Sequence, residues 1–177
     1  MTVVDYIHPP RTMLEAFMSL PEGTLAQLIE NNIVMSPSPL KRHQSISMEL
    51  SSELHFFVKT NRLGEVYAAP FDVHLDSTNV FQPDICFISK KRLHMLKKNG
   101  MFGAPDLVIE ILSPGTSKHD LVDKKAVYER CGVTELWFVD PENDQATGYH
   151  LRENKYQSFF TGTGKLQSQL LDFVINF

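Results

Sequence analysis

The sequence predicts an α/β fold with a mixed central sheet, flanked by helices and carrying peripheral β-hairpins. Segments of helical period alternate with apolar segments of strand length, and turn residues divide both ends of the chain into short strands. Residues 107–112 are almost continuously aliphatic, which is typical of a central strand covered on both faces. At 177 residues the chain has the length of about one domain, so we expect a single domain over residues 1–177.

In the first half of the chain, apolar spacing and turn residues set the expected boundaries. The expected elements are a helix over 11–20, a strand pair over 25–30 and 33–36 turning at Asn31-Asn32, a long helix over 40–60, a strand over 65–76 interrupted at Pro70, and a strand over 84–88. A polar loop or helix over 90–103 follows.

In the second half, Ser117 and Asp120 are placed as a capping box at the start of a helix. The expected elements are a strand over 107–112, that helix over 117–131, a strand over 135–139, hairpin strands over 148–151 and 156–160, and a final segment over 166–177. Strands and helices are therefore interleaved around a centre that we expect to have three layers.

Composition excludes several classes of protein. The formal net charge is −4, so nucleic-acid binding would need a local basic patch. The two cysteines, Cys86 and Cys131, form no C-x-x-C pattern, which argues against a disulfide scaffold and a cysteine zinc site. Neither a signal-peptide pattern nor a long apolar segment occurs, so a cytoplasmic protein without membrane contact is expected.

Two carboxylates on apolar strands are the most informative feature. Glu110 lies within the aliphatic run, and Asp84 begins the other apolar strand directly after Pro83. A buried carboxylate must be paired or must coordinate a metal. The pair therefore predicts a site for a hard divalent cation, and the alternatives are a structural pair of Glu110 with Lys or Arg, or a Glu that reaches solvent.

A lysine on the following helix is the third candidate. Asp120, Lys124, Val127 and Tyr128 share one helix face, because they are spaced by three and four residues. Val127 and Tyr128 are expected to face the sheet, which directs Lys124 inward. The alternative is an ordinary ion pair between Asp120 and Lys124 on the helix surface.

Several sequence blocks occur in a specific order. The main block is GAPDLVIEILSPGT at 103–116, followed by DLVDK at 120–124, Tyr128, Gly132-Val133 and WFVDP at 137–141, and preceded by VMSPSP at 34–39, His43 and QPD at 82–84. Together these blocks resemble a known family, the Uma-type endonucleases of the PD-(D/E)xK superfamily. The resemblance spans nearly the whole chain and implies a restriction-endonuclease-like core.

The resemblance also implies residue roles. Asp84, Glu110 and Lys124 match the catalytic positions, and the metal ligands would be Asp84, Glu110 and the carbonyl of Ile111. Such oxygen donors suit Mg²⁺ or Mn²⁺, with an activated water attacking the phosphodiester. Two positions depart from the pattern. Leu112 stands where the superfamily lysine usually stands, two residues after the acid, and Gln27 aligns with a glutamate of many family members.

Other polar residues are weaker candidates for the site. His43, Asp120, Tyr128 and Gln27 are possible supporting residues. A basic run with Lys90, Lys91, Lys97 and Lys98, together with Lys118, is a candidate phosphate-binding surface or simply a solvated one.

Two functions follow from these expectations. The first is a divalent-metal-dependent nuclease that hydrolyses phosphodiester bonds in nucleic acid, with DNA as the expected substrate and RNA as the alternative. The second is a catalytically inactive nucleic-acid-binding or protein-interaction module of the same fold, in which Gln27 marks lost chemistry. The sequence leaves homo-oligomerisation open.

Overall fold

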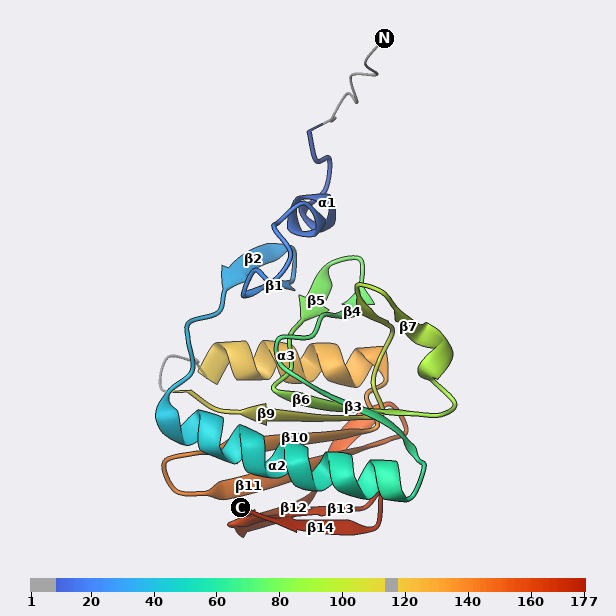
Figure 1. The fold of residues 1–177 in the computed structure, drawn as a ribbon. Coiled ribbons are helices and arrows are strands. Elements are labelled where there is room, and N and C mark those ends of the chain that lie inside the picture. The colour runs from blue at the N-terminus through green and yellow to red at the C-terminus, as the bar shows by residue number, and fades with distance from the viewer. Residues whose placement is uncertain (1–8, 114–117) are drawn as a thin grey trace.

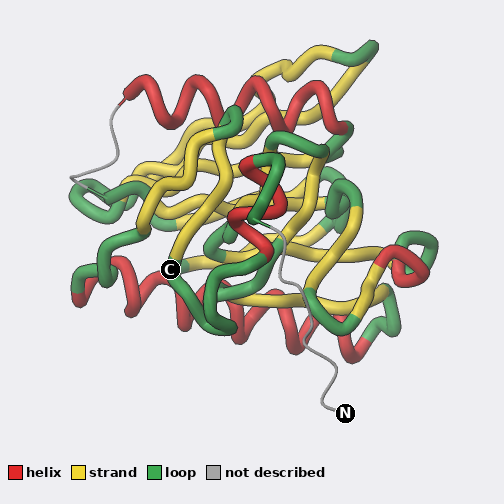
Figure 2. Tube along the Cα trace, turned by 90° about the horizontal axis from the view of Figure 1, so that it is seen from above, coloured by secondary structure: helices red, strands yellow, loops and turns green. Residues whose placement is uncertain are grey.

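The computed structural model describes residues 9–113 and 118–177. Its layers are stacked in the order helix, central sheet, helix, second sheet (Figure 1). The long helices α2 (Lys41–Thr60) and α3 (Lys118–Cys131) lie on opposite sides of the central sheet (Figure 2). The predicted three-layered centre is therefore present, and the second sheet covers the far side of α3.

The central sheet is mixed, as the sequence predicts. Its strands, in spatial order, are β12 (Lys155–Thr163), β11 (Gln145–Arg152), β10 (Glu135–Asp140), β9 (Leu107–Ile111), β6 (Ile85–Ser89) and β3 (Gly64–Ala68). Only β9 and β10 are parallel, and α3 provides the crossover that a parallel pair requires. Because β9 is an inner strand packed on both faces, all five of its residues are buried.

The second sheet is assembled from short strands that are distant in sequence. Its spatial order is β2 (Asn32–Met35), β1 (Ala26–Ile29), β5 (Asn79–Phe81), β4 (Val73–Asp76), β8 (Gly100–Phe102) and β7 (Leu96–Lys97). The short helix α1 (Met13–Met18) packs on its outer face through Phe17, which contacts a cluster with Leu28 and Val80. A final hairpin, β13 (Lys165–Ser168) with β14 (Phe173–Asn176), packs beside α2.

Helical spacing explains how the two long helices are held. One stripe of α2, with Ile46, Leu50 and Leu54, packs against the face of the central sheet that carries Ile109. The face of α3 that carries Val127 and Tyr128 is fully buried between the central and second sheets. Among the residues described, no helix is long and apolar enough to cross a bilayer.

The structure corrects several expected boundaries. The strand expected over 65–76 is two strands in different sheets, separated by the cis peptide before Pro70, and β5 is absent from the sequence prediction. The first hairpin turns one residue earlier, at Glu30 and Asn31, whose φ angles of 47° and 63° suit a tight hairpin turn. Residues 90–103, expected as loop or helix, contain a 3₁₀ turn (Leu93–Met95) and the β7–β8 hairpin.

Candidate active site

Strand pairing brings the two acids to the same end of the central sheet. β6 runs antiparallel to β9, and the last pair of their register joins Ile85 to Ile109. Asp84 and Glu110 each come one residue beyond this pair, so they lie next to one another across the two strands. The two carboxylates also interact electrostatically, because the negative charge of Asp84 helps to raise the pKa of Glu110.

Glu110 is buried and held by two groups from α3. Its residue surface is 7% exposed, and the Lys124 ammonium lies 3.0 Å and 3.1 Å from its two carboxylate oxygens. The Tyr128 hydroxyl donates to Oε1 over 2.6 Å. Burial raises the pKa of Glu110, whereas the Lys124 charge and the Tyr128 hydrogen bond oppose that rise. The inward direction predicted for Lys124 is therefore observed, together with the structural pairing that the sequence left as an alternative.

Asp84 is held by a different pair of groups. The backbone N–H of Ile111 donates to Asp84 Oδ2 over 2.7 Å, and Nε2 of His43 lies 3.2 Å from Asp84 Oδ1. His43 belongs to the first turn of α2 and is 8% exposed. Its hydrogen bond to Asp84 raises the pKa of His43, and burial opposes the rise. His43, a possible supporting residue in the sequence, thus contacts one of the two acids.

These side chains line a cleft of about 540 Å³. The cleft is bounded by the 36–40 segment, the start of α2 and the ends of β6 and β9, and its lining includes His43, Asp84, Glu110, Ile111 and Lys124. A volume of this size suits a small ligand or one segment of a polymer. Because Glu110 and Lys124 line this cleft, an incoming molecule can reach the pair although both residues are buried.

Gln27 also lines the cleft, and both ends of its amide are engaged. Its Oε1 accepts from the backbone N–H of Gln82 over 3.1 Å, and its Nε2 donates to Ser36 Oγ over 3.2 Å. The Gln82 side chain in turn donates to Asp72 Oδ1 over 2.8 Å. Gln27 therefore ties β1 to the segment that precedes Asp84. Sequence reasoning missed Gln82 as a contact residue, although its place in the QPD block was a usable signal.

The lysines of the predicted basic run, Lys90, Lys91, Lys97 and Lys98, do not line the cleft that holds the two acids. Lys90 and Lys91 follow β6 at the end opposite Asp84, which five residues of strand place about 17 Å away. Lys97 lies with its ammonium 4.4 Å from the ring centre of Phe102 on the second sheet, and Lys98 lines another cleft there. The side chains of Lys118 and Asp120 lie outside the described residues.

The chain was compared with protein-family models, curated proteins and solved structures. A family model described as "Uma2: Putative restriction endonuclease" matches residues 14–176. The chain belongs to the Uma2 family. Among curated proteins, no significant match is found.

A solved structure resembles this Uma2 chain over most of its length. It is a crystal structure of a "putative nuclease belonging to DUF820" from Anabaena variabilis ATCC 29413. The two sequences are 25% identical, the match covers 85% of this chain and 84% of the other, and the TM-score is 0.71. The resemblance to a restriction-endonuclease-like family, expected from the sequence blocks, is confirmed, and membership of this Uma2 family supports nuclease function.

Proposed function

We propose that this Uma2 protein is a divalent-metal-dependent nuclease that hydrolyses phosphodiester bonds, with DNA as the preferred substrate. The observation that carries the proposal is the convergence of Asp84, Glu110 and Lys124 on one open cleft. Burying two carboxylates side by side is costly, and a cation shared between them would relieve their repulsion. A module that binds nucleic acid without cutting it has no need of this arrangement.

The donor set fits a hard cation that keeps some of its waters. Asp84, Glu110 and the Ile111 carbonyl offer only oxygen donors, which Mg²⁺ and Mn²⁺ prefer. Within residues 9–113 and 118–177, no group of three His, Cys, Asp or Glu side chains is arranged to hold a metal. Two carboxylates plus retained water match the usual protein environment of Mg²⁺ better than that of zinc.

The residues of the chain would divide the work between them. Glu110 and Asp84 would hold the ion, which supplies an acidified water and positive charge beside the phosphate. Lys124, already held in the cleft by Glu110, would donate to a non-bridging phosphate oxygen as charge develops there. Tyr128 and the backbone of Ile111 would fix the directions of the two carboxylates.

One observation favours the second candidate, a catalytically inactive module. Gln27 replaces the glutamate of many family members, and its amide oxygen and nitrogen are both bonded, to Gln82 and to Ser36. An amide cannot serve as an anionic ligand or a general base. In this reading Gln27 is a structural link, and the cleft binds nucleic acid without cutting it.

Cleavage assays on plasmid and single-stranded DNA distinguish the two candidates. Wild type should cut DNA with Mg²⁺ or Mn²⁺ and should stop when the metal is chelated. Asp84→Asn and Lys124→Met should each reduce cleavage by at least about a hundredfold, as removal of a charge-stabilising group does. Glu53→Gln, an exposed change on α2, serves as the control and should cut like wild type. Metal-independent binding with no cleavage by wild type would favour the inactive module.

A further inference from the structure

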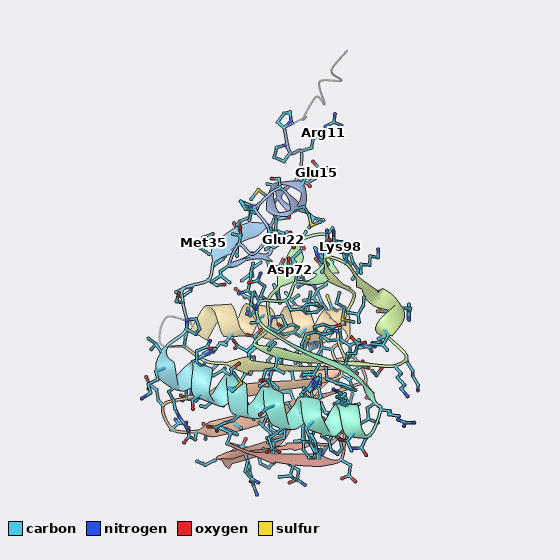
Figure 3. All side chains as sticks on the ribbon, in the orientation of Figure 1. Arg11, Glu15, Glu22, Met35, Asp72 and Lys98 are labelled. Atoms are coloured by element: carbon cyan, nitrogen blue, oxygen red, sulfur yellow. The ribbon has the colours of Figure 1, made fainter. Side chains whose placement is uncertain are left out.

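A second cleft opens on the outer face of the second sheet. It measures about 580 Å³ and lies between the segment that follows α1 and the strands β4 and β8. Apolar walls come from Phe17, Leu20 and Phe71, and Asp72 and Lys98 add charge. Glu22, Asp72 and Lys98 gather at this end of the molecule (Figure 3).

The cleft contains a buried acceptor that has no partner. His74 lines it, is only 8% exposed, and stacks on Phe102 with ring centres 4.2 Å apart. Burial lowers the pKa of His74, so its imidazole is neutral near pH 7, and its hydrogen bond goes to the backbone of Asn99. Nε2 of His74 has no partner among the described residues. A neutral imidazole that donates through one nitrogen presents a lone pair at the other, so this nitrogen requires a donor.

The second cleft is adjacent to the candidate active site, since the two clefts share lining residues. Pro70 and Gln82 line both clefts. The Gln82 backbone bonds to Gln27 in the first cleft, and its side chain bonds to Asp72 in the second. A chain-like ligand could therefore occupy both clefts at once, passing over Gln82, two residues from Asp84.

We propose that the second cleft holds an unpaired nucleotide of the strand whose phosphodiester lies beside Asp84 and Glu110. The apolar walls take the face of the base, a base amino group donates to His74 Nε2, and Lys98 meets a backbone phosphate. This gives one member of the basic run a role. The inference rests on the proposed nuclease function and specifies its substrate, because a base inside a duplex cannot enter the cleft. The substrate is single-stranded, or is a duplex from which one base is extruded.

Binding of a labelled single-stranded oligonucleotide, measured by fluorescence anisotropy in the presence of a chelator, tests this proposal without any cleavage. The probes are one oligonucleotide and a series in which a single abasic site is moved along it. Wild type should bind one member of the series about tenfold more weakly than the intact strand. His74→Phe keeps the ring on Phe102 but removes the acceptor, so it should weaken binding of the intact strand and narrow its difference from that member, while the apolar walls still favour a base.

Lys98→Glu provides a second readout at an exposed position. It should weaken binding of the intact strand by about tenfold, whereas Lys59→Glu, the same charge change at the far end of α2, should not. The proposal is overturned if no abasic position matters to wild type, or if His74→Phe and Lys98→Glu both bind like wild type. If wild type still cuts DNA in that case, the nuclease proposal stands alone. If no oligonucleotide binds in the chelator, the second-cleft proposal fails, and the cleavage assay with Mg²⁺ or Mn²⁺ decides the nuclease proposal separately.

Discussion

The backbone N–H of Ile111 donates to the carboxylate of Asp84 over 2.7 Å. Ile111, the residue that follows Glu110 in β9, therefore positions the other acid. Strand β9 contributes Glu110 to the site and holds Asp84 through its main chain. Side-chain changes at Asp84 that keep an acceptor, such as Asp84→Asn, should preserve this strand contact. We expect Asp84→Asn to retain the wild-type circular dichroism spectrum and to lose metal binding.

Breaking the buried pair should destabilise the fold. Lys124 and Glu110 are 8% and 7% exposed and contact each other at 3.0 Å. Lys124→Met leaves a buried carboxylate without its cation, which should lower the free energy of unfolding by about 3 kcal/mol. In urea unfolding, the double variant with Glu110→Gln should recover part of this loss. Strictly additive losses would show that the two groups do not interact.

Tyr128→Phe isolates one hydrogen bond, since the ring keeps its packing. Tyr128 is fully buried, its ring meets Phe81 edge-on, and its hydroxyl bonds to Glu110. Loss of a hydrogen bond to a charged group should cost about 1.5–3 kcal/mol of unfolding free energy. Tyr156→Phe, which removes a hydrogen bond to the backbone carbonyl of Val133, is the matched control. We expect only Tyr128→Phe to weaken Mn²⁺ binding in calorimetric titrations.

The long helices and the buried strands could be predicted from the sequence because their signals are local. The α2 stripe and the aliphatic run around Glu110 each repeat within one element, and helical spacing alone directed Lys124 toward the sheet. The second sheet could not be predicted in the same way. Its strand β5 has three residues, and its pairing with β1 joins Leu28 to Val80, a contact set by the whole fold.

The finer contacts of the site depend on the same long-range assembly. The bond of His43 to Asp84 requires the start of α2 to meet the start of β6, and no local pattern specifies that contact. The bond of Gln27 to the Gln82 backbone joins β1 to the residue that follows β5, two segments that are 55 residues apart in the chain. The sequence blocks identified most of these residues, but only the packed structure shows which of them touch.

Acid should weaken one link between the second sheet and α3. Burial raises the pKa of Asp76, but hydrogen bonds from Asn79, Thr78 and Arg130 outweigh it and lower the pKa to about 2. Because the pKa of Asp76 is lower in the folded than in the unfolded state, its ionised carboxylate stabilises the fold at pH values above the unfolded-state pKa, near 3.8. That stabilisation is lost as the pH falls toward 2. Asp76→Asn should therefore be less stable than wild type at neutral pH, and the difference should shrink below about pH 3. An equal difference at both pH values would contradict this assignment.

Divalent cations should stabilise the folded protein. A ligand that binds only the native state adds about 2.7 kcal/mol at a hundredfold excess over its Kd. Thermal unfolding with millimolar Mn²⁺ should raise the Tm of wild type and leave that of Asp84→Asn nearly unchanged. Ca²⁺ provides a comparison, because it prefers more oxygen ligands than this cleft offers. Equal shifts in both proteins would mean that Mn²⁺ binds elsewhere.

The most direct measurement is the anomalous diffraction signal of Mn²⁺ in crystals of the wild-type protein soaked with the ion. The proposed site predicts a peak between the carboxylates of Asp84 and Glu110, about 2.1–2.2 Å from at least one oxygen of each. The peak should be absent from Asp84→Asn crystals treated in the same way. No peak at this position in wild-type crystals soaked at a concentration that supports DNA cleavage would contradict a metal centre built on these two acids.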